Sequence, residues 1–173
     1  ENIPLIADVF LMLDILESMG AEVQWKGERM VSINTKNLDP SEMDSKLVRR
    51  FRGSVLFMGP LLSRFGKVFL PVPGGDIIGA RPIDLHLKGF EALGAQIEIE
   101  HGDVKARASK LQGADIYLGG SFGSSVLATG NVMMAATLAH GITRIENAAC
   151  EPEVVDLANF LISMGAKIHG AGS

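Results

Sequence analysis

One phrase occurs three times along this 173-residue chain, at nearly constant spacing. The copies are residues 16–23, 90–97 and 161–168. Each begins with Leu or Phe, contains a Gly-Ala pair and ends in Val or Ile, and the glycines lie 74 and then 71 residues apart. A period this long exceeds those of the common solenoid repeats. The chain is therefore predicted to fold as successive copies of one α/β unit around a shared core.

Each copy of the phrase carries the signals of a helix that ends and a strand that begins. In the first copy Val9, Leu13 and Leu16 recur at helical spacing before Gly20. A glycine at this point is typical of a left-handed cap that closes a helix. Apolar and polar residues then alternate, which predicts a strand, and in the first two copies a hairpin turns near Gly27 and Gly102.

A second element repeats with nearly the same period. An apolar helical pattern ends at Gly66, and another ends at Gly141, 75 residues later. The predicted helices with their following strands are residues 54–65 with 67–70, and residues 125–140 with 142–146. A further short strand is predicted at residues 115–118, before the later helix.

These elements predict an α/β fold (α+β by some schemes) of repeated βαβαββ-like units within one domain. The units are about residues 1–72, 73–147 and 148–173. The third unit contains a helix and one strand within these residues, so its remainder is expected outside them.

Composition excludes several classes of function. Hydrophobic residues make up 47% of the chain, which is ordinary for a globular protein, and the net charge of −4 without charge runs argues against nucleic-acid binding. Apolar stretches such as residues 132–139 are too short to span a bilayer, so no membrane partner is expected. A single cysteine, Cys150, fits a reducing compartment, and the cytoplasm is the expected location.

Neither a metal nor a cofactor is expected. The four histidines fall in separate predicted elements and show no spacing typical of metal ligands. The Gly-rich residues 71–82 lack the Gly-Lys-Ser/Thr of a Walker loop.

The Gly- and Pro-rich residues 71–82 show neither a helical nor a strand period and are predicted to form a loop. Asp76 and Arg81 are its only charged residues. Backbone amides near its glycines could hold an anion together with Arg81. A plain turn that contains an aspartate would also explain this pattern.

Three helix starts contain further candidate residues. Pro82 is normal in a first helical turn and Asp84 suits the positive end of the helix dipole, whereas Arg81 at this end is unfavourable without a nearby anion. Ser124 and Ser125 precede the helix predicted at 125, where they fit either a phosphate site or an ordinary cap. Arg52 lies in an arginine cluster for which a solvated basic face is the alternative.

Four stretches resemble the UDP-N-acetylglucosamine 1-carboxyvinyltransferases of the enolpyruvyl transferase family. They are residues 58–66 (MGPLLSRFG), 73–86 (PGGDIIGARPIDLH), 145–149 (IENAA) and 151–161 (EPEVVDLANFL). The resemblance covers the whole chain. It implies the family's inside-out α/β barrel fold, in which each of two domains consists of three βαβαββ units. This chain would be most of one such domain, and the second domain would be its missing partner.

The resemblance also implies a reaction. The family transfers the enolpyruvyl group of phosphoenolpyruvate to the 3-hydroxyl of UDP-N-acetylglucosamine, the first committed step of peptidoglycan synthesis, on which cell-wall formation, cell shape and cell division depend. Asp76 stands where many members carry a cysteine that acts as the general acid and reacts with fosfomycin. The variant therefore implies fosfomycin resistance. An aspartic acid can donate this proton only if its surroundings raise its pKa.

Substrate contacts are likewise implied for residues on three segments. They are Arg52; Arg81, Pro82, Ile83, Asp84 and Leu85; and Ser124, Ser125 and Val126. Arg81 would face phosphate, residues 81–85 would line the uracil and diphosphate, and Ser125 and Val126 would bind the diphosphate.

The chain departs from the family pattern at several points. Leu127 replaces the glycine of the family's Ser-Val-Gly motif, and Cys150 stands where many members have an arginine. The family's N-terminal Lys-Asn pair and the acidic base and arginine of the other domain are absent from residues 1–173, so this chain alone is expected to be inactive. Two alternatives remain: the sister 5-enolpyruvylshikimate-3-phosphate synthase reaction, and a non-catalytic ligand-binding domain of the same fold.

Overall fold

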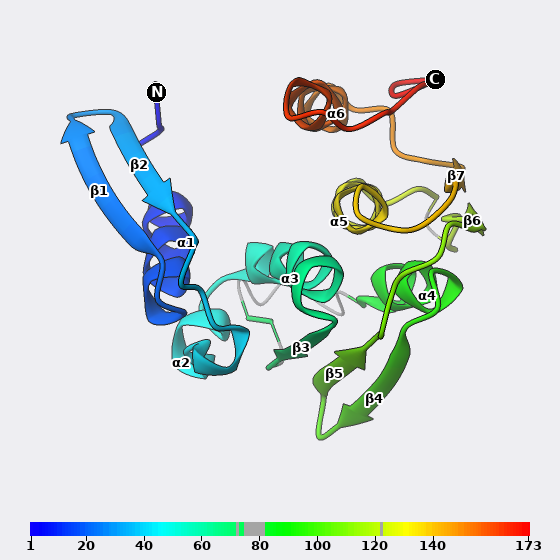
Figure 1. Cartoon of the computed structure of the whole chain (residues 1–173), viewed down its shortest axis with the longest axis horizontal. Coiled ribbons are helices and arrows are strands. Elements are labelled where there is room, and N and C mark those ends of the chain that lie inside the picture. The colour runs from blue at the N-terminus through cyan, green and yellow to red at the C-terminus, as the bar shows by residue number, and fades with distance from the viewer. Residues whose placement is uncertain (72, 75–81, 122) are drawn as a thin grey trace.

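The computed structural model describes residues 1–71, 73–74, 82–121 and 123–173 (Figure 1). Its elements up to the central loop are α1 (Ala7–Ser18), β1 (Glu22–Gly27), β2 (Met30–Asn34), η1 (Pro40–Glu42), α2 (Ser45–Val48), η2 (Arg52–Phe57), α3 (Met58–Phe65) and β3 (Lys67–Leu70). The later elements are α4 (Asp84–Ala92), β4 (Gln96–Glu100), β5 (Asp103–Arg107), β6 (Asp115–Tyr117), α5 (Val126–Ala136), β7 (Arg144–Glu146) and α6 (Pro152–Ser163).

The predicted glycine caps are confirmed in all three copies of the phrase. Gly20, Gly94 and Gly165 follow α1, α4 and α6 with φ of +88°, +91° and +103°. The amide of the next residue, always an alanine, donates to a carbonyl five residues earlier at 3.0, 2.9 and 3.0 Å. Only glycine adopts this left-handed conformation without strain. The repeated phrase therefore builds the same helix ending three times.

Both predicted hairpins are also present. β1 pairs with β2, and β4 pairs with β5, each antiparallel. His101 and Gly102 turn the second hairpin with φ of +52° and +86°. β3 joins it in a three-stranded sheet of order β3-β5-β4, and β6 pairs with β7 in parallel.

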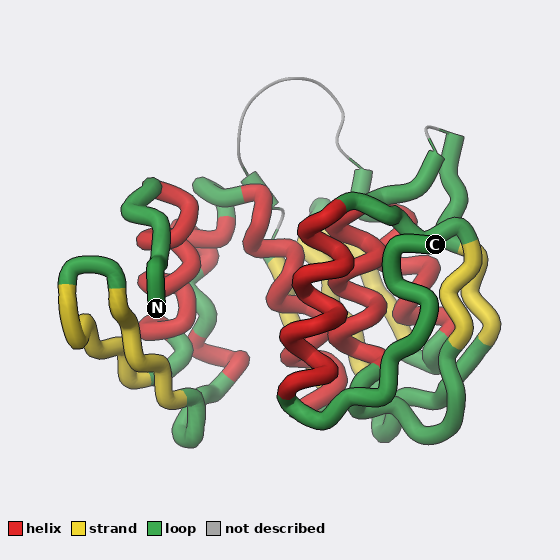
Figure 2. The backbone as a smooth tube through the Cα atoms, turned by 90° about the horizontal axis from the view of Figure 1, so that it is seen from above, coloured by secondary structure: helices red, strands yellow, loops and turns green. Residues whose placement is uncertain are grey.

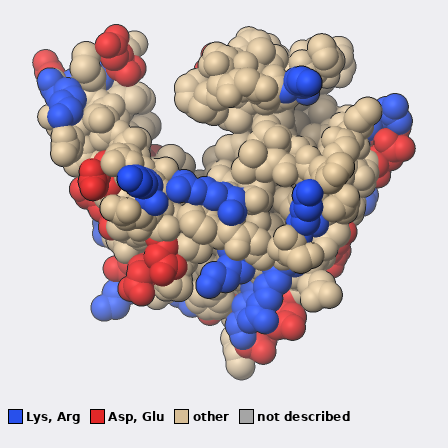
Figure 3. Space-filling model, in the orientation of Figure 1, with Lys and Arg blue, Asp and Glu red and all other residues tan. Residues whose placement is uncertain are grey.

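The central elements form successive layers (Figure 1). The β3-β5-β4 sheet buries alternate residues, among them Val68, Leu70 and Val104, beneath α3 and α4. α5 lies over α3 and α4, and α6 lies over α5, with these helices side by side (Figure 2). α5 is enclosed on several sides, and its residues are mostly apolar all round the helix, with Thr129 and Asn131 as the polar exceptions. The space-filling view shows a notch between the first hairpin and α6 (Figure 3).

Four elements differ in their boundaries from the sequence prediction, the smallest difference being that the strand predicted at 115–118 ends at Tyr117. The helix predicted at residues 54–65 is a 3-10 helix, η2, followed by α3. Pro60, which has no amide hydrogen, lies in the first turn of α3, where no intrahelical donor is required. The helix predicted at 125–140 ends at Ala136, and the strand predicted from 142 begins at Arg144.

The strand predicted after Gly165 is wrong for the described chain. Residues 166–170 follow α6 without strand structure. An extended segment becomes a strand only when another strand satisfies its backbone amides and carbonyls. No described segment pairs with residues 166–170.

No helix in the described ranges has both the length and the apolarity needed to cross a membrane.

Candidate functional site

The described candidate residues lie at the starts of three helical elements. Arg52 is the first residue of η2. Pro82, Ile83, Asp84 and Leu85 occupy the start of α4, and Ser124, Ser125 and Val126 occupy the start of α5. Asp76 and Arg81, the predicted acid and phosphate ligand, lie outside the described residues.

Arg52 connects η2 with the start of α4. Its guanidinium Nη2 donates to the carbonyl oxygen of Pro82 at 3.1 Å, across 30 residues of sequence. On the other side of the undescribed segment, the Gly74 amide donates to the Val48 carbonyl at 3.3 Å. A Cβ on Gly74 would lie 1.4 Å from the Arg49 carbonyl oxygen, so this close approach requires glycine. Residues 48–52 thus hold both flanks of the predicted catalytic loop.

Arg49 forms an ion pair with another part of the chain and does not bond to the starts of α4 or α5 in the described residues. Its guanidinium forms an ion pair with Asp103 at the tip of the second hairpin, with N and O 3.0 Å apart. The basic-face interpretation therefore fits Arg49, while Arg52 is directed toward α4.

The Gly- and Ser-rich loop before α5 approaches the start of α4. Gly120 and Gly123 exchange backbone hydrogen bonds of 3.0 and 3.1 Å. A Cβ on Gly120 would lie 3.4 Å from Leu85 Cδ1. Ser125 caps α5, because its hydroxyl oxygen accepts a hydrogen bond from the Ala128 amide at 3.3 Å. Ser125 therefore serves as a helix cap, its proposed role toward a phosphate stays a prediction, and Gly120 of the preceding loop lies beside Leu85.

Sequence reasoning missed the residue that joins these helix starts. Asn131, on α5, is completely buried. Its side-chain oxygen accepts from the Gly59 amide at 2.8 Å, and its amide nitrogen donates to the Val55 carbonyl at 2.8 Å. The same nitrogen lies 3.0 Å from His86 Nδ1. The available signal was a polar residue within the apolar stretch of α5.

The His86 ring is neutral in this setting. It is 2% exposed, and burial lowers its pKa to about 4, with a further lowering by the Arg52 charge that the Asp84 carboxylate partly offsets. Since the Asn131 amide donates to Nδ1, the imidazole hydrogen lies on Nε2.

The helix starts lie at one end of the α3–α4–α5 layer. Asn131 contacts the second residue of α3 and the third residue of α4, while Phe65, Gly94 and Leu138, at or after the ends of α3, α4 and α5, line one cavity, so these helices run in the same direction. Helix N-termini carry partial positive charge and free amides, which favour anions. The arrangement can therefore accept a phosphorylated ligand.

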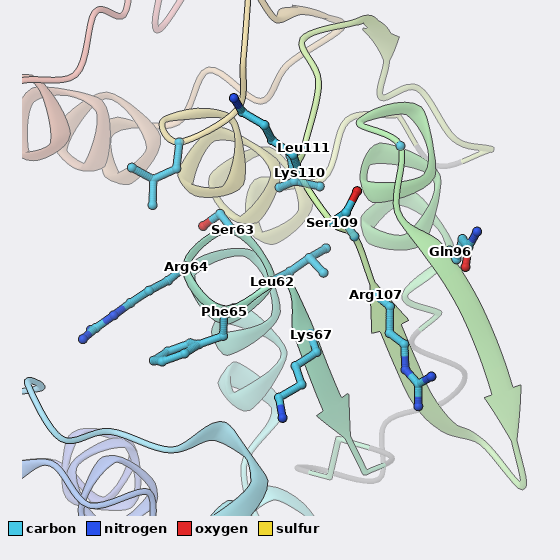
Figure 4. Close-up of a pocket in the computed structure, with 14 residues that line it drawn as sticks. Leu62, Ser63, Arg64, Phe65, Lys67, Gln96, Arg107, Ser109, Lys110 and Leu111 are labelled. Atoms are coloured by element: carbon cyan, nitrogen blue, oxygen red, sulfur yellow. The ribbon is translucent and has the colours of Figure 1, made fainter.

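A cavity of about 780 Å³ lies at the opposite end, beside Phe65, Gly94 and Leu138 at or after the ends of these helices. Lys and Arg side chains gather on the face over α3, β3 and β5 (Figure 3). The charged ends of Arg64, Lys67 and Lys110 point in different directions (Figure 4). Arg64 is held by Thr35, at 2.9 and 2.8 Å. Arg64, Lys67 and Lys110 therefore do not converge on one point in this cavity.

The chain is similar in sequence to known bacterial enzymes. It is 54% identical over 172 residues to UDP-N-acetylglucosamine 1-carboxyvinyltransferase 2 of Carboxydothermus hydrogenoformans. It is 53% identical over 172 residues to UDP-N-acetylglucosamine 1-carboxyvinyltransferase of Gloeobacter violaceus. Both alignments cover 99% of this chain but 40% and 37% of the relatives, so the chain spans less than half of their length.

Solved structures of enolpyruvyl transferases share this fold. NikO from Streptomyces tendae matches with a TM-score of 0.80 at 23% identity, over 98% of this chain and 39% of NikO. EPSP synthase from Acinetobacter baumannii matches with a TM-score of 0.69 at 20% identity, over 94% of this chain and 37% of that enzyme. The predicted fold is thereby confirmed. The profile of EPSP synthase (3-phosphoshikimate 1-carboxyvinyltransferase) matches residues 1–173 throughout, and the chain belongs to this family.

Proposed function

We propose that the complete protein carrying this chain transfers the enolpyruvyl group of phosphoenolpyruvate to the 3-hydroxyl of UDP-N-acetylglucosamine. The observation that carries this choice of acceptor is the 51–54% identity, over nearly the whole chain, to several enzymes named for it. Identity to the solved EPSP synthase is 20%. Peptidoglycan synthesis in the cytoplasm is the matching cellular role.

The starts of α4 and α5 supply the binding site for the sugar nucleotide. Their amides and positive dipole ends favour its diphosphate, with Ser124, Ser125 and Val126 on one side and residues 82–85 on the other. Arg52 contributes a cation beside the start of α4. Arg81 contributes a further cation for the phosphate of phosphoenolpyruvate.

In the proposed reaction Asp76 is the general acid. It donates its proton to the methylene carbon of phosphoenolpyruvate while the oxygen of the sugar 3-hydroxyl bonds to the adjacent carbon. The hydroxyl proton passes to a base in the part of the protein beyond this chain. In the second step the carbon–phosphate oxygen bond breaks, inorganic phosphate leaves, and the methyl group returns one proton to restore the double bond. Groups beyond residues 1–173 complete the site, so this chain alone does not turn over.

The acceptor is tested with the complete protein. Phosphate release from phosphoenolpyruvate is measured with UDP-N-acetylglucosamine and, separately, with shikimate 3-phosphate. We expect phosphate release when UDP-N-acetylglucosamine is the acceptor and none when shikimate 3-phosphate is the acceptor. Turnover with shikimate 3-phosphate instead would establish the sister reaction, and binding of the sugar nucleotide without phosphate release would establish a ligand-binding protein.

A further inference from the structure

We propose that Asn131 and His86 are positioning residues that hold Arg52, residues 82–85 and the start of α5 in one arrangement for the substrate. This inference rests on the proposed function, because that function makes these three segments the binding site.

The first support is the set of segments that Asn131 joins. Val55 lies three residues after Arg52 on η2, and His86 follows Leu85 directly on α4. Asn131 itself lies six residues after Ser125 on α5. Each bonded segment therefore leads within two turns to a residue assigned to the substrate. The hydrogen bond from Arg52 to the Pro82 carbonyl is a second link between η2 and the start of α4.

The second support is the completeness of the network. Asn131 uses its one oxygen and both amide hydrogens on three different segments, and the residue is 0% exposed. A buried amide with all its partners fixes the geometry of those partners, because breaking any bond leaves an unsatisfied polar group. The network thus specifies one relative position for η2, α3 and α4.

The third support is that His86 departs from the repeat. Counted back from the capping glycine, the position of His86 is held by Met12 in the first copy and by Leu157 in the third. The same helix ending is therefore built twice with an apolar residue at this place. The imidazole is not needed for the repeated helix and its cap, whereas it gives Asn131 an acceptor next to the candidate site.

The main test replaces Asn131 by Leu in the complete protein. The Gly59 amide and the Val55 carbonyl lose their partner, and the helix starts become free to shift. A misplacement of about 1 Å can cost roughly 100-fold in an enzyme, and we expect the KM for UDP-N-acetylglucosamine to rise roughly 10- to 100-fold, with a smaller change in kcat.

A matched control lies two residues away on the same helix. Thr129 is equally buried, and its hydroxyl accepts from the Ala149 amide at 3.0 Å, a bond that leads toward α6 instead of the helix starts. Thr129→Val removes one buried hydrogen bond without changing the shape of the side chain much. It should lower thermal stability but leave the KM of the folded enzyme within about threefold of the parent. Equal KM values for Asn131→Leu and Thr129→Val would overturn the proposal.

A pair of His86 variants decides the matter if Asn131→Leu does not fold. His86→Asn retains an acceptor near the place of Nδ1, whereas His86→Met inserts the residue of the first copy and offers no comparable acceptor. We expect His86→Met to raise the KM and His86→Asn to restore much of the parent value. An unchanged KM in His86→Met would overturn the proposal.

Hydrogen exchange separates a failure of this inference from a failure of the proposed function. If the parent protein turns over neither acceptor, the proposed function fails, yet amide protection can still be measured. The positioning role predicts that Asn131→Leu loses protection in residues 52–60 and 82–90, whereas Thr129→Val loses it near Ala149. Unchanged protection of 52–60 and 82–90 in folded Asn131→Leu would overturn the positioning role.

Discussion

The first and second of the predicted repeat units share a capped helix and a hairpin, but they differ in the segment between the hairpin and the helix that follows it. Both contain a capped helix and a hairpin, made by α1, β1 and β2 in one and by α4, β4 and β5 in the other. In the second unit β6 and a Gly/Ser-rich loop then lead into α5. In the first unit η1, α2 and η2 lead into α3, without a described counterpart of β6.

Part of the candidate site occupies the segments in which the units differ, whereas residues 82–85 lie at the start of the shared capped helix α4. Arg52 lies on η2, and Ser124 and Ser125 lie in the loop before α5. Residues 71–82, predicted to form a loop, join the two predicted units. The repeated phrase supplies helix endings and hairpins, which are the same whatever the protein binds. The candidate residues thus lie in unrepeated segments and at the start of one repeated helix, whereas the capping glycines lie at the helix ends. Substitutions at the candidate residues and at the capping glycines should therefore have different consequences.

The largest effect is expected in the loop between the units. In the complete protein Asp76→Asn removes the proposed acid while it retains a side chain of similar size that tolerates the same turn. The turnover number should fall by roughly 10²–10⁴-fold with little change in substrate binding. Asp76→Glu should retain more activity, because it keeps an acid displaced by one methylene. If Asp76 serves only to form a turn, steady-state kinetics will show the opposite: Asp76→Asn will have nearly the parent turnover number, and Asp76→Glu will have the lower one.

A second effect, on stability, concerns the histidine that interrupts the repeat. The folded pKa of His86 is about 4, below its ordinary value of 6.5, because burial and Arg52 disfavour the charged ring, against a smaller opposing effect of Asp84. Below pH 6.5 the unfolded chain therefore binds a proton that the folded chain does not. The stability that the neutral ring contributes is present above pH 6.5 and is lost as the pH falls toward 4, by about 3 kcal/mol in total.

The measurement compares His86→Met with the parent. Urea unfolding between pH 7 and pH 4 should show the parent losing about 3 kcal/mol more than the variant. Carboxylates titrate in both proteins, so their contribution cancels in the difference. Equal losses in the two proteins would show that the pKa of His86 is the same in the folded and unfolded chains.

The sequence predicted the frame well because caps and hairpins depend on local residues. Gly20, Gly94 and Gly165 predicted three helix ends, which the structure confirms. The strand after Gly165 was wrong, since a strand depends on a partner that local sequence does not reveal. Asn131 was missed for a related reason: its partners Val55 and Gly59 lie 76 and 72 residues away in the sequence. The acid role of Asp76 came from family resemblance, whereas residue chemistry also indicated an anion near Arg81, and both roles stay predictions.

A third effect concerns the contact between the two units. A Cβ on Gly59 of α3 would lie 2.3 Å from the Asn131 carbonyl oxygen and 2.6 Å from its side-chain oxygen. Gly59→Ala should therefore push α3 away from α5 and cost about 1–3 kcal/mol of unfolding free energy. Because the displacement acts on the Asn131 network, it should also raise the KM for the sugar nucleotide. A stable variant with normal KM would show that α3 can shift without disturbing the site.

The smallest effect is expected at the capping glycines, where the two units are most alike. An alanine at Gly94 meets no atom within 4 Å, so its cost arises from the left-handed backbone alone, about 1–2 kcal/mol. At Gly20 the same substitution also brings Cβ to 3.2 Å from the Asn37 carbonyl oxygen, which adds a steric cost. Urea unfolding should therefore rank Gly20→Ala as more destabilising than Gly94→Ala. Neither variant should alter the KM, because both glycines lie at helix ends remote from the candidate residues. A rise in KM for Gly94→Ala that exceeds the one for Gly59→Ala would contradict the separation of the capping glycines from the candidate residues.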